Sequence, residues 1–570
     1  MKTVLIRPSN RSGSLYLTKM GFLPIPLGLV QLASSIRAVQ GNSVSIIDME
    51  ADRLTVEEAV EKAIGMHPDV VGITVHATAA YNNARLIMNR LKSLDSELTV
   101  VVGGHHATFL PEQILEDGFD IVVLGEGDRT IAEIVQKIGN RESLESVAGI
   151  YFRKDGKNLR TPPRQLIPSL DELPLPAFDL IEREKYRFLT FGKNETVACI
   201  ETSRGCPYGC DFCSVTPTWG FRRRNKSNRR IIEEMELAER FGYNWIFFTD
   251  DIFLLPQNLK DRMKLFEYIT ERGINIQWIA QMRADAIARN PEFIPPAVKA
   301  GLRVAALGVE SGSREVLKKM RKRIRQSDTE KAVSELDRNG VITLLSFMMG
   351  APYERIRDMI STVRLGFNLA GRGADVAQFT IYTPLPGTEV FREAVEHNRL
   401  FTLDWDRFDF FTPVMKTRVN PVVIQLFQYL GLYSFYIRRF LIDTGKARNM
   451  NWPKRDLLPS AITYMLSEMP EFVRDVLSIP NQLAKTYSLF AALSVTRPNR
   501  KEMDMLIRDC DVPVYLDEKR RRVAGPALPS MHDKTVNGGS SGKDINSQAA
   551  GSFAVNEDGI GRKAIARMKT

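Results

Sequence analysis

Three of the chain's five cysteines lie in one short segment, ETSRGCPYGCDFCSV at 201–215. They follow the spacing Cys206-x3-Cys210-x2-Cys213. Thiolates are metal ligands, and three of them on one loop predict a metal centre. A disulfide framework does not fit, because such frameworks belong to small secreted domains that are dense in cysteine.

The number of thiolates bears on which metal centre is expected. A structural zinc site takes four ligands. A fourth cysteine is available only as Cys199, inside a predicted strand, or as Cys510, far along the chain. A cluster of four irons also normally takes four thiolates, so three would leave one iron with the open position that a catalytic site needs. A structural zinc loop and chance clustering remain the alternatives.

The elements around the cysteines predict a (β/α) barrel over residues 195–415. Strand-like runs alternate with helical segments there, and VACIETS comes directly before the cysteines. The other strand candidates are WIFFTDD, QWIAQMR, VAALGVES, LLSFMMG and VAQFTIYTPLP. Six strand–helix units fit a partial or full barrel, whose active site lies at the carboxyl ends of its strands. The cysteine loop therefore lies where catalysis is expected.

A second α/β domain is predicted over residues 1–150. Short runs rich in β-branched residues alternate with helical segments, which predicts a doubly wound, Rossmann-like parallel sheet. The ligand of such a sheet lies beyond the carboxyl ends of its strands. The loops expected at that edge contain Asp48, Thr74, Gly103, Gly104, His105, Gly125, Glu126 and Gly127.

The remaining segments are assigned by composition. Residues 151–194 contain many prolines and no sustained period, which predicts an extended linker. Residues 416–525 are predicted to form a helical C-terminal domain. The polar, Gly/Ser-rich tail at 526–570 is predicted to be disordered.

The net charge of +10 suits an anionic partner, although it also suits simple solubility. The chain lacks the aromatic-interleaved basic modules of nucleic-acid binders, so no nucleic acid partner is expected. No apolar run reaches the length of a membrane-spanning helix, and the N-terminus does not resemble a signal peptide. We therefore expect the protein to be cytoplasmic.

The cysteine spacing, with Phe212 before the last cysteine, resembles that of the radical S-adenosylmethionine enzymes. The resemblance implies that Cys206, Cys210 and Cys213 bind a 4Fe–4S cluster whose open iron is chelated by S-adenosylmethionine. In that family, an electron from the cluster cleaves S-adenosylmethionine and leaves a 5′-deoxyadenosyl radical. That radical removes hydrogen from unactivated carbon.

Further motifs extend this resemblance over most of residues 195–400. Asp250 and Asp251 in FTDDIF match the family's contacts to the amino group of S-adenosylmethionine. A buried ammonium needs carboxylate or carbonyl acceptors, so the residue types agree. The alternative is an acidic loop or a helix cap. The other S-adenosylmethionine contacts that the resemblance implies are Phe212, Arg283, Glu310 and Ser311.

The first domain resembles the cobalamin-binding domain that precedes the barrel in one group of these enzymes. PLGLVQLASSI, GGHHAT and GEGDRT carry this resemblance, which implies cobalamin contacts from the eight edge residues given above. Glu50 stands where many cobalamin proteins have the histidine that ligates cobalt, and a carboxylate is a poor substitute. We therefore expect bound cobalamin without a protein nitrogen on cobalt; an empty domain is the alternative. His76, His105 and His106 lie on loops at this edge, where histidines more often form hydrogen bonds.

The whole pattern resembles the anaerobic magnesium-protoporphyrin monomethyl ester oxidative cyclases and their lipid-modifying relatives, which include hopanoid-modifying enzymes and archaeal tetraether-lipid ring synthases. It implies an enzyme that activates a C–H bond of a hydrophobic, lipid-like substrate to form a C–C bond, by ring formation or methylation. Oxidative ring closure of a tetrapyrrole is the alternative enzyme reaction. A cobalamin or iron–sulfur electron-transfer protein without radical chemistry is the alternative of another class. An electron donor such as a ferredoxin or flavodoxin is the implied partner.

Two segments of the C-terminal region bear on membrane contact. Residues 421–441 and 461–479 are apolar and aromatic, with Lys or Arg at their ends. Such segments predict peripheral contact with the inner face of the membrane. Ordinary core helices that cover the barrel mouth are the alternative.

Overall fold

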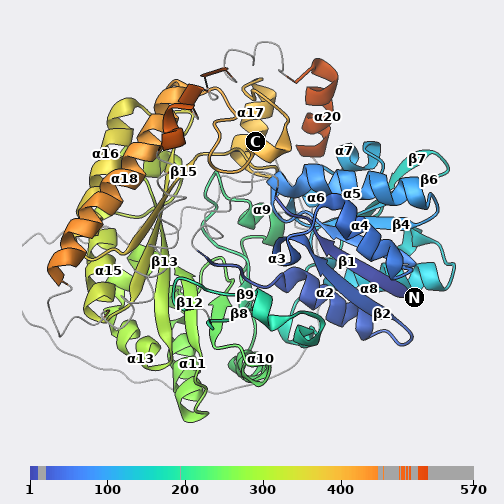
Figure 1. Ribbon diagram of the computed structural model, residues 1–570, viewed down its shortest axis with the longest axis horizontal. Coiled ribbons are helices and arrows are strands. Elements are labelled where there is room, and N and C mark those ends of the chain that lie inside the picture. Colours follow the sequence, from blue (N-terminus) through green and yellow to red (C-terminus); the bar gives the residue numbers. More distant parts are fainter. Residues whose placement is uncertain are drawn as a thin grey trace, which may run out of the picture. The chain divides into compact units, whose positions relative to one another are not determined.

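The computed structural model describes residues 1–10, 21–192, 194–446 and 498–510, together with isolated positions between 454 and 488. The predicted tail at 526–570 and all but a few residues of the segment 461–479 lie outside the described residues. Within the described part, two α/β sheets succeed one another along the chain and helices follow them (Figure 1).

The first sheet has the strand order β2-β1-β3-β4-β5-β6-β7. The first five strands in this order are parallel. Side chains of β1 alternate between two cores: Leu5 lies in one, and Val4 and Ile6 lie in the other. The strands of this sheet are β1 (Lys2–Arg7), β2 (Ser43–Asp48), β3 (Val70–Thr74), β4 (Thr99–Gly103), β5 (Ile121–Val123), β6 (Ile150–Lys154) and β7 (Lys157–Arg160).

Helices cover both faces of the first sheet. Helices α2 and α8 share one hydrophobic core, and α4 and α5 share the other, which confirms the predicted doubly wound arrangement (Figure 1). The helices of this region are α2 (Leu27–Arg37), α3 (Met49–Asp52), α4 (Val56–Gly65), α5 (Tyr81–Leu94), α6 (His105–Phe109), α7 (Pro111–Glu116) and α8 (Gly127–Gly139).

The start of the predicted linker is not extended coil but a β-hairpin. Strands β6 and β7 pair antiparallel and extend the first sheet. Asp155 and Gly156 form the turn, with φ of 50° and 75°. Positive φ at both central residues is the geometry that favours Asp-Gly in two-residue hairpin loops. The signal was present in the sequence KDGK, so the linker prediction was wrong for residues 151–160.

The second sheet has six parallel strands in the order β15-β14-β13-β12-β11-β8. Each strand neighbours the next one along the chain, and β8 does not pair with β15, so the barrel is partial, as predicted. Its strands are β8 (Val197–Ile200), β11 (Trp245–Phe248), β12 (Gln277–Met282), β13 (Leu302–Glu310), β14 (Ile342–Met349) and β15 (Val376–Ile381). A separate pair is formed by β9 (Ser203–Arg204) and β10 (Arg224–Asn225).

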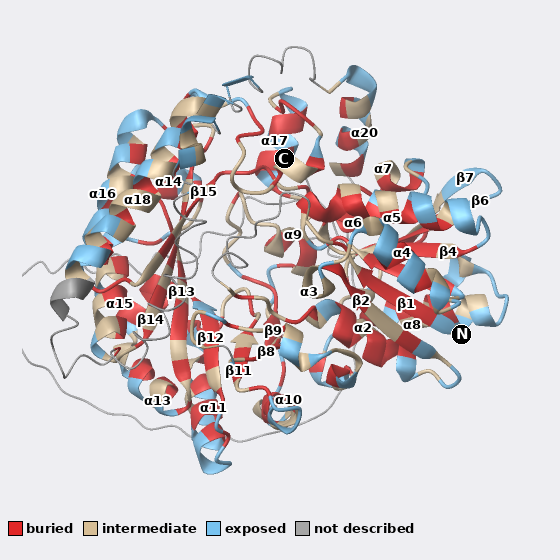
Figure 2. Cartoon of the chain, in the orientation of Figure 1, coloured by how far each residue is buried: buried red, intermediate tan, exposed pale blue. Residues whose placement is uncertain are grey.

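Helices connect these strands, and their outward faces are exposed while the strands are mostly buried (Figure 2). The C-terminal region is helical as predicted, and its described helices include α18 and α20. The helices are α9 (Val215–Trp219), α10 (Asn228–Arg240), α11 (Leu259–Glu271), α12 (Ala284–Arg289), α13 (Ile294–Lys299), α14 (Arg314–Lys319), α15 (Gln326–Arg338), α16 (Ile356–Gly371), α17 (Glu389–Glu396), α18 (Pro421–Lys446) and α20 (Arg500–Cys510).

Helix α20 packs against α7 of the first sheet and against α17. Asp509 accepts hydrogen bonds from the backbone N–H groups of Glu112 and Gln113, at 2.9 and 3.4 Å. These N–H groups belong to the first turn of α7, where no intrahelical partner is available. A side chain near the end of the described chain therefore caps a helix of the first domain.

Among the described residues, none of the helices is both long enough and apolar enough to cross a membrane.

Candidate active site

The three clustered cysteines lie on the loop between β9 and α9, past the carboxyl end of β8. The backbone N–H of Cys213 donates to the Cys210 carbonyl over 3.2 Å. The Cys210 thiol lies 3.9 Å from the carbonyl oxygen of Arg321, and the N–H of Asp211 donates to the Met320 carbonyl over 3.4 Å. The turn after α14 therefore supports the middle of the cysteine loop.

A second support reaches the loop from the far side of the barrel. Asp211, between two of the cysteines, accepts hydrogen bonds from the hydroxyls of Tyr382, at 2.8 Å, and Tyr353, at 3.2 Å. Burial raises the pKa of Asp211 to about 6, although both tyrosine hydroxyls act to lower it. The last barrel strand is thereby joined to the loop that follows the first.

Burial raises the pKa of all three thiols. The pKa of Cys206 rises to about 11, and that of Cys213 rises further. The pKa of Cys210 is also raised by burial, and the positive charges of Lys322 and Arg283 oppose this rise. Cysteine binds metal as the thiolate, so binding of a metal centre here would release protons and be favoured by these two cations.

The placement of the three thiols bears on the kind of metal centre that the loop could hold. In the described part of the chain, no group of three or more His, Cys, Asp or Glu side chains is placed to hold one metal ion. A four-iron cluster differs because its thiolates bind separate irons and need not converge on one point. The three cysteines of this loop could each supply one such thiolate.

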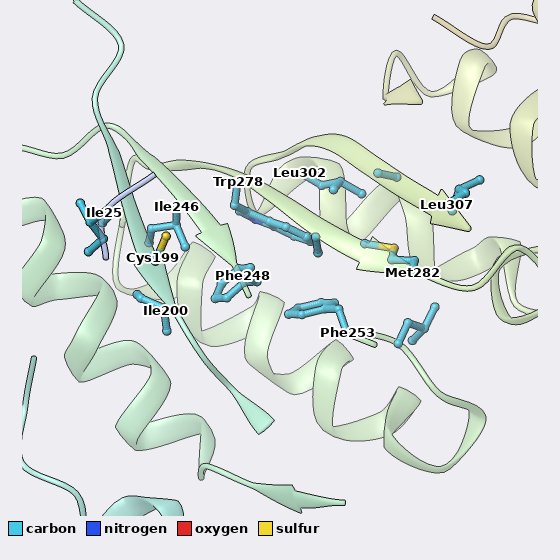
Figure 3. Close-up of a cluster of buried hydrophobic side chains, with 14 of the residues drawn as sticks. Ile25, Cys199, Ile200, Ile246, Phe248, Phe253, Trp278, Met282, Leu302 and Leu307 are labelled. Carbon is cyan, nitrogen blue, oxygen red and sulfur yellow. The ribbon is translucent and has the colours of Figure 1, made fainter. Parts of the chain in front are cut away.

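The other two cysteines lie elsewhere. Cys199 is 2% exposed within β8, and its sulfur is surrounded by apolar side chains that include Ile25, Ile200 and Ile246 (Figure 3). Burial raises the pKa of Cys199 to about 12. Cys510 ends α20, beside the first domain.

The two adjacent aspartates after β11 have different surroundings. Asp250 is fully buried, and its carboxylate accepts hydrogen bonds from the hydroxyls of Thr202 and Ser203 and from the Thr202 backbone N–H. Asp251 is only partly buried and accepts a hydrogen bond from the backbone N–H of Gly205, next to the first cluster cysteine. Burial and neighbouring negative charges raise the pKa of Asp251 to about 7. Of these two aspartates, Asp251 is the more accessible, and it lies next to the cysteine loop.

The other predicted S-adenosylmethionine contacts vary in accessibility. Arg283 is 4% exposed; it pairs with Asp285 at 2.9 Å and lies 3.6 Å over the ring of Tyr208 in the cysteine loop. Glu310, at the end of β13, pairs with Lys322 at 2.5 Å. Ser311 is fully buried and shares a hydrogen bond with the Thr362 hydroxyl.

Phe212 packs against a hydrophobic core that residues of the first domain and of the barrel share, with its ring 6.0 Å from that of Tyr382. Its side chain therefore helps to position the loop. Phe212 and the fully buried Ser311 therefore contact other parts of the protein, whereas Arg283 and Glu310 lie in ion pairs.

At the carboxyl edge of the first sheet, two predicted ligand contacts have other partners. Asp48 caps α3, pairs with Arg7 at 3.2 Å and accepts the Tyr186 hydroxyl at 3.0 Å. Glu126 accepts hydrogen bonds from the backbone N–H of Ile167 and from two arginines of the barrel. The carboxylates of both residues are occupied within the protein.

The remaining edge residues form a closely packed set of loops. Gly104 has φ of 105°, and a Cβ there would lie 2.7 Å from the Val75 carbonyl, so only glycine lets the two loops touch. Thr74 ends β3, and His105 follows Gly104 and is only partly buried. The other three glycines of the set belong to the same edge: Gly103 ends β4, Gly125 follows β5 with φ of 72°, and Gly127 begins α8.

A buried ion network joins this edge to the cysteine loop. Arg204, two residues before the first clustered cysteine, donates to Glu126 at 2.9 Å and to Asp128 at 2.8 Å. Its Nε donates to Glu201 at 2.8 Å, and Arg224 donates to Glu126 at 2.7 Å. Burial acts to raise the pKa of Asp128, but Arg204 outweighs it and holds that pKa below the usual value.

The sequence analysis did not identify Arg204, Asp128 or Arg224. The sequence did contain opposite charges in two motifs. GEGD places two acidic residues at the edge of the first sheet, and SRGC places an arginine next to the cysteines. That these groups meet depends on how the two domains pack, which local patterns do not report.

The comparisons with known proteins agree with this two-part architecture. The family described as B12 binding domain matches residues 13–135, and the Radical SAM superfamily matches residues 200–366.

Three curated relatives are similar over most of their length. An uncharacterized methyltransferase, PH0819, of Pyrococcus horikoshii is 33% identical over 77% of this chain and 93% of its own. The anaerobic magnesium-protoporphyrin IX monomethyl ester cyclase of Rubrivivax gelatinosus is 27% identical over 78% of each chain. The hopanoid C-3 methylase of Methylococcus capsulatus is 28% identical over 84% of this chain and 86% of its own.

Two solved structures share the fold. The radical S-adenosylmethionine methyltransferase TsrM from Kitasatospora setae has a TM-score of 0.56 at 20% identity, over 70% of this chain and 75% of that one. The cobalamin-dependent S-adenosylmethionine radical enzyme OxsB has a TM-score of 0.61 at 16% identity, over 90% of this chain and 84% of that one.

The Arg204 network predicts a large stability effect. Arg204→Ala leaves buried carboxylates without a counter-charge, which should lower the free energy of unfolding by about 3–5 kcal/mol. Arg37→Ala is the control, because Arg37 pairs with Asp179 at an exposed site and should cost about 0–1 kcal/mol. Urea unfolding followed by circular dichroism measures both. Equal effects of the two substitutions would contradict the proposed contribution of the network to the free energy of unfolding.

Proposed function

Since this chain belongs to the family of radical S-adenosylmethionine enzymes that carry a B12-binding domain, we propose that it activates a C–H bond of a hydrophobic, lipid-like substrate and forms a C–C bond there. The cofactors of this family supply the chemistry: a 4Fe–4S cluster cleaves S-adenosylmethionine reductively, and cobalamin carries a transferable group. The electron for each cleavage would come from a donor such as a ferredoxin or flavodoxin.

One observation carries the proposal. Three thiols lie on a loop at the carboxyl end of the first barrel strand, with an accessible carboxylate, Asp251, beside them. The same loop is joined through Arg204 to the ligand edge of the first sheet. A site for radical generation and a site for cobalamin would thus be neighbours.

We assign the residues as follows. Cys206, Cys210 and Cys213 would bind the cluster, and Asp251 would accept hydrogen bonds from the ammonium of S-adenosylmethionine. Asp250 would hold the loop through Thr202. The remaining candidates would fall into two groups: Glu310 and Arg283 near the cofactor, and Phe212 and Ser311 behind it.

We propose that cobalamin is contacted by the carboxyl edge of the first sheet, where glycines leave the backbone accessible. Close approach to a flat macrocycle suits glycine, so Gly103, Gly104 and Gly125 would line the site with Thr74 and His105. Asp48, Glu126 and Gly127 would hold these loops in place. We keep residues 1–150 and 195–415 as the extents of the two domains, with 161–194 as the connection between them.

Methylation is the form of C–C bond formation that the relatives favour. The 33% identical relative is named an uncharacterized methyltransferase, and the hopanoid C-3 methylase is a second methylating relative. Ring closure of a tetrapyrrole is the second candidate, because a magnesium-protoporphyrin cyclase is 27% identical over 78% of the chain. Incubation with candidate substrates and methyl-labelled S-adenosylmethionine separates them, since only methylation transfers the label to the product.

An exposed apolar face supports a lipid-like substrate. On α18, Leu426, Leu430, Ile437 and Leu441 recur at helical spacing and are 50–62% exposed, and Phe440 beside them is 63% exposed. The adjacent helix α16 adds Ile356, Ile360 and Phe367, which are 40–48% exposed. Contiguous apolar patches of this kind mark interaction sites.

Exposed arginines favour an anionic membrane surface as the partner of this face. Arg357 and Arg364 on α16 are exposed, and Arg438 lies 5.1 Å over the ring of Phe367. Arg439, by contrast, is buried and pairs with Asp375 at 3.0 Å, so it holds α18 on the barrel. We propose peripheral contact through α16 and α18, with anionic headgroups near the arginines.

The cluster assignment predicts iron content. Anaerobically reconstituted protein should hold about four irons per chain and form 5′-deoxyadenosine from S-adenosylmethionine with a reductant. Alanine at Cys206, Cys210 or Cys213 should abolish both. Cys199→Ala and Cys510→Ala are the controls and should retain both. Loss of the cluster in Cys510→Ala would show that the three-thiolate assignment is wrong.

The different surroundings of the two aspartates predict different defects. Asp251→Asn should leave the iron content intact and weaken S-adenosylmethionine binding by about tenfold to a hundredfold, because a charged hydrogen bond is lost. Asp250→Asn should instead lower the thermal stability, because its buried carboxylate holds Thr202 and Ser203. Equilibrium binding and calorimetry on the reconstituted protein measure both. Unchanged affinity in Asp251→Asn would move the ammonium site elsewhere.

The apolar face predicts salt-sensitive membrane binding. The protein should sediment with anionic vesicles and should be released as salt screens the headgroups. Ile437→Glu with Phe440→Glu should abolish sedimentation, whereas Leu94→Glu, at a 53% exposed position of the first domain, should not. Absence of binding to any vesicle would contradict membrane contact and favour a soluble substrate.

A further inference from the structure

A strongly basic turn joins α14 to α15. Its sequence, KKMRKRIR at 318–325, holds six Lys or Arg side chains and no acidic one. Lys318 and Lys319 lie in the last turn of α14, where positive charge is favourable at the C-terminus of any helix. The basic residues continue beyond the helix, however, over 321–325. Interaction with the helix end therefore accounts for only part of this charge.

The basic turn lies directly against the cysteine loop. The Arg321 carbonyl oxygen is 3.9 Å from the Cys210 sulfur, and the Met320 carbonyl accepts the N–H of Asp211 over 3.4 Å. Arg321 and Arg323 have φ of 56° and 52°, in the left-handed region that favours glycine. Such strain is concentrated at functional sites. The turn thus keeps arginine side chains where glycine would cost less.

Two side chains of the basic turn are balanced by acidic residues of the barrel. Lys322 is mostly buried and pairs with Glu310 at 2.5 Å. Arg321 pairs with Glu389 of α17. The positive charges of these two residues are therefore compensated within the protein.

Three further side chains of the turn face solvent. Lys318, Lys319 and Arg323 are exposed, and none of them forms an ion pair with a residue that the structure describes. The Nζ of Lys319 lies 5.0 Å from the centre of the Tyr353 ring, whose hydroxyl donates to Asp211 in the cysteine loop over 3.2 Å. The surface next to the cysteine loop is therefore positively charged.

We propose that this basic turn is the docking surface for the electron donor, an acidic one-electron carrier of the ferredoxin or flavodoxin type. The proposal rests on the proposed function, because the electron is needed only if the three cysteines bind a cluster that cleaves S-adenosylmethionine. Electron transfer slows steeply with distance, so the donor must dock where a cluster ligand lies close to the surface. At this turn, the single residue Arg321 separates Cys210 from exposed neighbours.

The chemistry of the step suits a charged and transient interface. Complementary charge speeds the encounter of two proteins and orients them more than it tightens the complex. Electron-transfer complexes accordingly have small interfaces. One electron moves in each encounter. It leaves the reduced flavin or iron–sulfur centre of the donor, which is oxidised, and reduces the cluster that the three cysteines would hold.

The rate of cluster reduction tests the docking surface. Full-length protein, reconstituted with iron and sulfide but without cobalamin, is mixed anaerobically with reduced flavodoxin and followed by rapid-freeze electron paramagnetic resonance. The rate should fall as salt screens the charges. Lys318→Glu with Arg323→Glu should slow the reduction by about tenfold to a hundredfold, because the electrostatic attraction is reversed. Iron content and reduction by dithionite, which needs no docking surface, should match the parent.

A charge-matched variant is the control. Lys260→Glu with Lys264→Glu changes the net charge equally at exposed positions of α11 and should leave the rate with flavodoxin unchanged. Equal rates in the test and control variants overturn the docking surface. An unchanged rate together with lost sedimentation on anionic vesicles in the test variant also overturns it and assigns the turn to membrane contact. A parent protein whose iron dithionite cannot reduce contradicts the proposed cluster, and the docking surface with it.

Discussion

The structure depends most on the buried contact between Arg204 and the acidic pair Glu126 and Asp128. Removing these groups from water costs several kcal/mol per ion, and the cost is offset only if partners are held in good geometry. Arg204, Glu126 and Asp128 have side chains that are 2–7% exposed. The contact therefore does not tolerate sliding of one domain on the other. It fixes the loop after β5 next to the cysteine loop, to which Arg204 belongs.

The parts of the fold that could be predicted are those recorded in short stretches of sequence. Buried parallel strands read as runs of β-branched residues, and the cysteine spacing lies within one loop. The hairpin at 150–160 was equally local, but the prolines that follow it dominated the interpretation of the whole segment. The prediction was wrong because the composition of the whole segment 151–194 was used for its first ten residues. The turn residues Asp155 and Gly156 carried the correct information.

The parts that could not be predicted concern the direction of side chains. Asp250 and Asp251 are neighbours with the same chemistry, yet one is fully buried and the other is accessible beside Gly205. Both residues follow the end of β11, and adjacent side chains that leave a strand end need not point the same way. A motif can name both residues, but it cannot say which of them faces the ligand. The same limit applies to Glu126, which the motif named and whose carboxylate pairs with Arg204 and Arg224.

The short helix α9 shows why the two candidate sites should be considered together. It begins two residues after the last cysteine, and with five residues it is too short to be stable alone. Its position is set by what it touches: Thr218 meets His105 at the edge of the first sheet, and Trp219 lies 5.2 Å beneath the Arg204 guanidinium. A change in the cysteine loop would displace α9 and, through Thr218, the histidine that packs on His76. The cysteine loop and the cobalamin edge thus share one set of supports, and neither can be rebuilt without disturbing the other.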